Sequence, residues 1–118
     1  MKRASIVSHC QLKDDVGALA AKMTERWLLS LRETNPAILA MFRERDTLPY
    51  RDLLPWSGEF AGKVLTGEVL VYRLTGQQKL LDEIIAFTEE LISCIDADGY
   101  CGCFSKACRL TGACSQAP

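Results

Sequence analysis

Side chains able to do chemistry are few in this 118-residue chain, and cysteines are the most numerous candidates. Four of the six cysteines lie in the C-terminal tail: Cys101, Cys103, Cys108 and Cys114. Thiolates bind soft metals such as zinc, but this spacing contains no paired Cys-x2-Cys knuckle and has no histidine nearby. The only histidine, His9, lies in an N-terminal stretch without helical periodicity. The pattern therefore favours scattered thiols, with a zinc site as the alternative.

The sequence and its composition indicate in which cellular compartment the protein lies and which classes of binding partner are excluded. The first residues, MKRASIVSHCQLKDD, are partly basic but are not followed by the apolar segment of a secretory signal peptide. We therefore expect a cytoplasmic protein with reduced cysteines rather than disulfides. No apolar run approaches the roughly 20 residues of a membrane span. A net charge of -1 without a basic stripe argues against binding to nucleic acid. We therefore expect neither a membrane nor a nucleic acid as a partner.

Two carboxylates, Glu59 and Glu68, lie on one strongly apolar segment. About 100° of helix rotation separates them, so they do not form an evident acid/base pair. Glu59 is the more prominent, because Trp56 and Gly58 flank it where a helix should begin. Its simplest role is to stabilise the helix dipole from the first turn, and the alternative is a pocket carboxylate. No catalytic residue is assigned.

The apolar periodicity that must position these groups is helical throughout, so we predict an all-α fold with helices near 15–33, 36–45, 57–75 and 79–95. The first helix carries an apolar series at helical spacing: Val16, Leu19, Ala20, Met23, Trp27 and Leu31. Ser57 is the expected N-cap of the third helix, and Gly76 its end. The short link at 76–78 makes the last two helices antiparallel neighbours.

The packing of this last pair can be predicted in more detail. We expect one apolar stripe of the last helix, Leu81, Ile84, Ile85, Leu91 and Ile92, to pack against Ala61, Val64, Leu65 and Tyr72. Asp82, Glu83, Glu89 and Glu90 should then face water. Gly58, Gly62 and Gly67 predict close approach of a backbone or ligand.

The predicted domain organisation has three parts. A flexible arm covers 1–13, helical hairpins cover 14–100, and an irregular Cys-rich tail covers 101–118.

Three motifs in this order suggest a family: PWSGEFAGK at 55–63, YRLTG at 72–76 and DGYCG at 98–102. Together with NPAILAMFRERD at 35–46, they resemble the N-terminal part of the beta-L-arabinofuranosidase-like glycoside hydrolases, formerly a family of unknown function. The resemblance covers about residues 19–112. It implies part of an (α/α)6 barrel, as in six-hairpin glycosidases, with Trp56 and Glu59 as substrate-binding residues. Family members bind zinc through a glutamate and cysteines, and use a cysteine nucleophile and a glutamate acid/base.

Those zinc-binding and catalytic residues lie later in the family's chain, and nothing in this sequence matches them. The resemblance thus implies a truncated N-terminal fragment of a glycoside hydrolase, acting in carbohydrate metabolism but inactive alone. It would bind carbohydrate in the complete fold and carry no catalytic, cofactor or metal residues itself. Two hairpins would leave apolar faces open, so self-association is expected. The alternative is a small helical-hairpin module that binds proteins without catalysis.

Overall fold

The computed structural model describes residues 13–109, and this range is helical without any strand. The elements are α1 (Asp14–Arg26), the 3-10 turn η1 (Leu28–Ser30), α2 (Leu31–Thr34), α3 (Ala37–Arg43), α4 (Glu59–Thr75) and α5 (Gln78–Ser93). The predicted all-α class is confirmed. Residues 1–12 and 110–118 lie outside the described part, and with them most of the predicted arm and half of the predicted tail.

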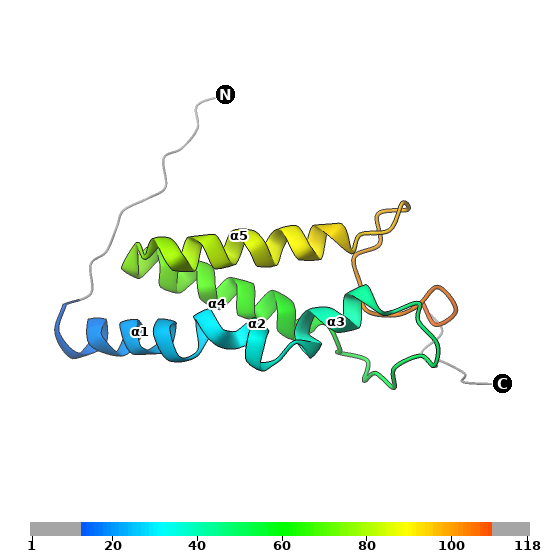
Figure 1. The fold of residues 1–118 in the computed structure, drawn as a ribbon, viewed down its shortest axis with the longest axis horizontal. Helices are drawn as coiled ribbons and strands as arrows, with labels where there is room; N and C mark the ends of the chain where they lie inside the picture. The colour runs from blue at the N-terminus through cyan, green and yellow to red at the C-terminus, as the bar shows by residue number, and fades with distance from the viewer. Residues whose placement is uncertain (1–12, 110–118) are drawn as a thin grey trace, which may run out of the picture.

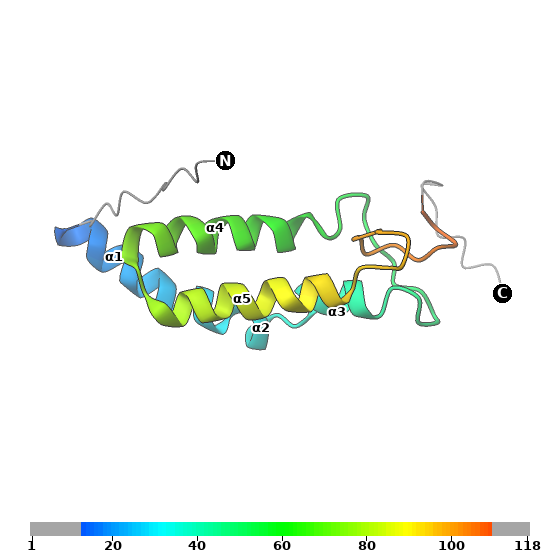
Figure 2. The ribbon, with the colours of Figure 1, turned by 90° about the horizontal axis from the view of Figure 1, so that it is seen from above.

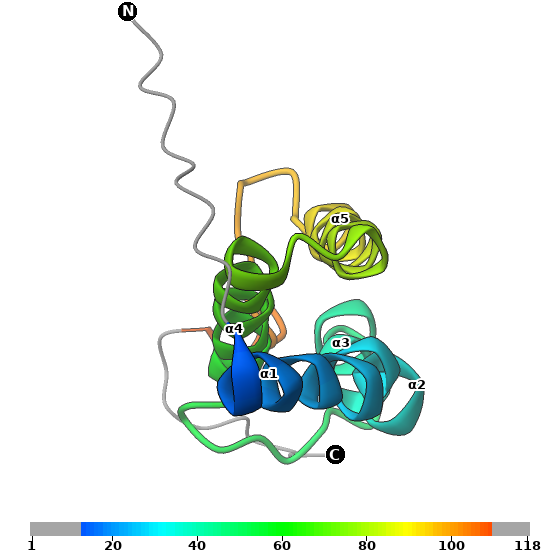
Figure 3. The same ribbon diagram turned by 90° about the vertical axis from the view of Figure 1, so that its left-hand side faces the viewer.

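The helices form three rows. Helices α4 and α5 run antiparallel and side by side, as Figures 1 and 2 show. The third row is the continuous stretch from α1 through α3, which lies along both of them (Figure 3). The ends of α3 and α5 and the start of α4 all lie near the loop 94–109 (Figure 1). The opposite end of the bundle is closed by the α4–α5 turn.

The α4–α5 turn depends on one glycine. Gly76 adopts the left-handed conformation, with φ 64°, and its N–H donates to the Tyr72 carbonyl over 2.7 Å. Glycine reaches this conformation without the steric cost of a Cβ, so α4 can end sharply and the chain can reverse. The predicted end of the helix and the antiparallel hairpin are both confirmed.

The first predicted helix, 15–33, is wrong in one respect, because the chain breaks at Trp27 into α1, η1 and α2. Trp27 has φ -128° and ψ -62°, and the Ser30 hydroxyl donates back to the Arg26 and Trp27 carbonyls. Such side-chain bonding to the preceding turn competes with the helical ladder and bends it. After this break, the side chains of Leu28 and Leu31 point into the interior, where both are buried.

The core is a single cluster contributed by every row and by the loop after α5. Its buried members are Leu31, Ile38, Leu39, Phe42, Ala61, Val64, Phe87, Cys94 and Cys103. Burial of Ala61 and Val64 agrees with the sequence prediction. The predicted stripe of α5 is wrong at Ile85 and Ile92, which are 46% and 58% exposed, whereas Leu91 packs against the core as expected. The buried residues are Leu80 and Phe87 of α5 and Cys94 directly after it, which recur every seven residues.

A second apolar series points away from the core. Four large side chains of the α1 series are exposed: Val16, Leu19, Met23 and Trp27. The residue of α1 that is buried is Thr24, whose hydroxyl donates to the Ala20 carbonyl over 2.9 Å. Helix α1 therefore leaves its large apolar side chains uncovered and packs with its small residues: Gly17, Ala20, Ala21 and Thr24. No helix in the described range is long and apolar enough to cross a membrane.

Phe87 should contribute far more to stability than Ile85. Phe87→Ala removes a fully buried ring, and we expect the free energy of unfolding to fall by about 3–5 kcal/mol. Ile85→Ala, the matched control on the same helix, should lose less than about 1 kcal/mol, because nearly half of that side chain is in water. Urea denaturation of both variants measures the difference. Equal losses would contradict this assignment of the core.

Candidate functional site

The two residues predicted to bind substrate lie at the start of α4. Trp56 is 63% exposed, and Glu59 is an exposed first-turn residue whose N–H donates to the Trp56 carbonyl over 3.1 Å. The Glu59 carboxylate pairs with Lys63 one turn on, Oε1 to Nζ 2.8 Å. An exposed pair of this kind contributes little to stability. An indole, a carboxylate and an ammonium thus share one open surface, with the half-exposed Phe60 beside them.

This surface is supported from beneath by the loop after α5. The Cys103 thiol donates to the Ser57 carbonyl over 2.9 Å. The N-cap of α4 is Gly58 rather than the expected Ser57, at φ 94°, and no side chain caps this end. A Cβ on Gly58 would lie 3.1 Å from the Cys103 sulfur and 3.2 Å from Phe42 Cζ. The close approach predicted from the glycines is therefore confirmed at Gly58, whereas no neighbouring atom lies within 4 Å of a Cβ at Gly62 or Gly67.

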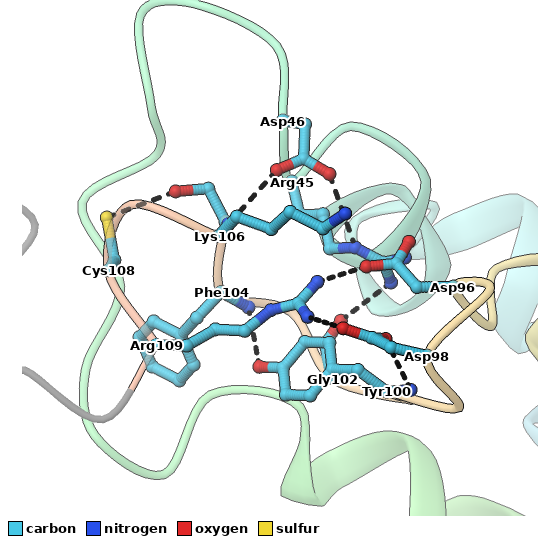
Figure 4. A network of polar contacts seen from close by, with 11 residues as sticks. Arg45, Asp46, Asp96, Asp98, Tyr100, Gly102, Phe104, Lys106, Cys108 and Arg109 are labelled. Carbon is cyan, nitrogen blue, oxygen red and sulfur yellow. Dashed lines mark hydrogen bonds and ion pairs between the residues drawn. The ribbon is translucent and has the colours of Figure 1, made fainter.

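A network of charged side chains holds that loop in place (Figure 4). Arg45, which is buried, donates to the Asp96 carboxylate and to the Gly102 carbonyl, the latter over 3.0 Å. Arg109 donates to Asp96 as well, and its guanidinium lies 3.6 Å from the centre of the Tyr100 ring. Hydrogen bonds from Arg109 and Arg45 hold the pKa of Asp96 below its usual value. The first part of the predicted irregular tail is thus a folded loop fixed by ion pairs.

The tail cysteines have separate environments. Cys108 is disulfide-bonded, so the expectation of reduced thiols is wrong at that position. Cys94, Cys101 and Cys103 are free, and burial raises the pKa of the Cys103 thiol, which keeps its proton. Within 13–109 no three side chains of the metal-binding types come together. Cys114 lies outside the described residues, and the four-cysteine zinc alternative stays a hypothesis.

A buried carboxyl group lies inside the helical bundle, where the sequence did not indicate a site. Glu68 of α4 is fully buried, and neither of its oxygens has a hydrogen-bond partner in the described part of the chain. Burial raises the pKa of Glu68 to about 7; the nearby charge of Glu83 acts in the same direction, and Arg32 opposes it. Burial disfavours the ionised form of such a carboxyl, because the anion loses the solvation that it would have in water.

Arg32, at the start of α2, acts on this carboxyl through its charge and belongs to a chain of ion pairs. It donates to both oxygens of Glu83, with Nη2 to Oε2 at 2.9 Å, and to Glu90 with Nη1 to Oε2 at 3.4 Å. Arg43 donates to the other oxygen of Glu90 over 2.5 Å. The prediction that Glu83 and Glu90 face water is wrong, since both are only partly exposed. Their arginine partners are more than 45 residues away in sequence, beyond the reach of any local pattern.

A small cavity of about 120 Å³ lies beside these ion pairs. Its lining includes Arg32, Asn35, Arg43 and Glu90, together with apolar side chains of α3. Trp56 and Glu59 do not belong to its lining. The substrate-binding residues expected from the sequence and the charged cluster between the helices are therefore two different places on the molecule.

Comparisons of the chain with protein-family models, with curated proteins and with solved structures find no match. The resemblance to arabinofuranosidases therefore depends on the sequence motifs themselves.

Gly58 should be the glycine of this region that cannot be replaced. Gly58→Ala places a Cβ against Cys103 and Phe42 in a left-handed backbone, and we expect a loss of about 1–3 kcal/mol. Gly62→Ala is the matched control, because its Cβ would meet open space within the helix and should stabilise by up to about 1 kcal/mol. Thermal or urea unfolding distinguishes the two. A Gly58→Ala variant as stable as the parent would show that this corner is not tightly packed.

Proposed function

We propose that this chain is the N-terminal part of a glycoside hydrolase resembling the beta-L-arabinofuranosidases, contributing helical hairpins to an (α/α)6 barrel. The sequence motifs at 55–63, 72–76 and 98–102 support the family. In the folded chain these motifs occupy the start of α4, the α4–α5 turn and the folded loop after α5. Each motif therefore lies at a helix end or in a loop, where glycines and turns are needed.

The observation that carries the proposal is the uncovered apolar surface of the outer helices. Leu19 of α1 is 59% exposed, as are Val16, Met23 and the adjoining Trp27 to similar degrees, and Ile85 and Ile92 of α5 are exposed as well, together with Ile95 just after it. Leaving several large apolar side chains in water on one helix face is costly, and such faces commonly mark contact surfaces. In a ring of hairpins every helix has neighbours on both sides, so further hairpins would cover both stripes.

Trp56 and Glu59 are proposed to bind carbohydrate in the complete barrel. The exposed indole offers a flat apolar surface, and the adjacent carboxylate can accept hydrogen bonds from hydroxyl groups. Cys103 and Gly58 hold this corner against the core, so the two side chains project from a fixed backbone. Pre-organised groups on a rigid element bind with less entropy cost.

Catalysis is not expected from this chain alone. Glycoside hydrolysis normally needs two groups on opposite sides of the scissile bond. Glu59 is paired with Lys63 on an open surface, and Glu68 is sealed inside the bundle. No residue here matches the zinc ligands or the catalytic residues of the family, so no step is assigned to zinc.

Purified 1–118 should therefore not hydrolyse aryl arabinofuranosides. The assay compares the chain with its Glu59→Gln variant, and we expect both to show only the uncatalysed rate. Turnover by the parent that disappears in Glu59→Gln would overturn the proposal and make Glu59 catalytic.

The alternative function is a self-contained helical module that binds another protein through the same exposed faces, without any role in sugar chemistry. Its support is also the apolar stripe of α1, since a partner's helix would cover that stripe as well as a hairpin would. The two functions differ in how the isolated chain should behave.

As a barrel fragment, the isolated chain should self-associate and bind dyes that report apolar surface. Leu19→Glu places a charge in the middle of the exposed stripe and should reduce association, whereas Lys22→Glu on the exposed polar side should not. Sedimentation across a concentration series measures this. A strictly monomeric particle without dye binding would contradict the barrel-fragment proposal.

A further inference from the structure

Glu68 is the one fully buried carboxyl in the described range whose oxygens both lack a partner. Arg32, the cation whose charge acts on Glu68, gives its N–H groups to Glu83 and Glu90. Buried polar groups are almost always hydrogen-bonded, so an orphaned carboxyl calls for a reason beyond packing. An apolar side chain at this position would avoid the desolvation cost altogether.

The charges around Glu68 balance only when it carries a proton. The ion-pair cluster contains the carboxylates Glu83 and Glu90 and the guanidiniums Arg32 and Arg43, two of each sign. An ionised Glu68 adds one uncompensated negative charge. The charged groups acting on it are Arg32 from α2 and Glu83 from α5. Helix α1 buries the uncharged Thr24, and α3 buries apolar side chains, so neither brings a compensating cation.

We propose that Glu68 is a proton-operated latch that sets how firmly the α1–α2 segment is held on the α4–α5 hairpin. When Glu68 is protonated, Arg32 binds both oxygens of Glu83 through its Nε and Nη2 and so ties α2 to α5. When Glu68 loses its proton, the buried anion either remains unsolvated or draws Arg32 away from Glu83. Both outcomes weaken the hold of α2 on α5, because a desolvated carboxylate is stabilised only by a cation or by water.

The direction of the pH dependence follows from the two states of the group. Its pKa is about 7 in the folded chain against 4.5 for the ordinary carboxyl, so the folded state holds a proton that the unfolded state releases in this window. The free energy of unfolding therefore decreases as pH rises from about 4.5 to about 7, and stays low above it. Below the lower value both states are protonated, and the effect vanishes.

Hydrogen exchange of the full chain tests the latch. Between about pH 5.5 and about pH 8, protection of α1 and α2 amides should fall roughly ten- to thirtyfold after correction for intrinsic exchange. Protection of the α4–α5 pair should fall less. Glu68→Gln, which cannot ionise, should keep the protection of α1 and α2 constant over this range.

Two further variants make the outcome decisive. Glu89→Gln removes an exposed carboxylate from α5 and should retain the parent's pH dependence. Glu68→Met, of similar volume and also non-ionisable, should behave as Glu68→Gln does and serves if the amide is poorly tolerated. Unchanged protection in the parent, or the same pH dependence in the parent and in either Glu68 variant, would overturn the proposal.

Discussion

The ion pair between Arg32 and Glu83 joins residues that are 51 positions apart, and it sets the α1–α3 stretch against the hairpin. Both oxygens of Glu83 are bound, so the planar guanidinium fixes orientation as well as distance. Leu31, next to Arg32, belongs to the same core cluster as the buried side chains of α3 and Phe87 of α5. The charges of Arg32 and Glu83 both act on Glu68. In the proposed latch, the protonation state of Glu68 therefore affects the Arg32–Glu83 ion pair on which this packing depends.

A second set of long-range contacts fixes the other end of the bundle. Arg45 and Arg109 converge on Asp96, and Cys103 reaches beneath the start of α4 to the Ser57 carbonyl. The loop after α5 is thereby part of the fold, although it has no helix or strand of its own. These contacts give the Trp56–Glu59 corner a rigid base, as a binding surface requires. The proposed sugar-binding corner thus lies at a fixed end of the bundle, and the proposed latch lies further along.

Much of the secondary structure could be predicted because its signals are local. Glycine at position 76 and the apolar periodicity were enough for the hairpin, and the predicted helix at 36–45 contains α3. The face of α5 could not be predicted, because that helix has apolar residues on most sides and burial is decided by its neighbours. The same holds for Glu83 and Glu90, whose burial depends on distant arginines, and for Trp27, where side-chain competition breaks a pattern that continues in sequence. The exposed position of Trp56 and Glu59 follows from the motif's place at a helix start, whereas the Cys103 support beneath it requires the folded loop.

The most direct measurement is the titration of Glu68 itself. Carbon-13 NMR of side-chain carboxyls, with Glu68→Gln used to assign the resonance, reports the proton affinity of this one group in the intact chain. The structure predicts that the Glu68 carboxyl titrates with a pKa of about 7, far above the ordinary 4.5, with a shift sensed at the Arg32 guanidinium over the same pH range. A Glu68 carboxyl that titrates near 4.5, without any response at Arg32, would mean that the group is solvated and that the proposed latch is wrong.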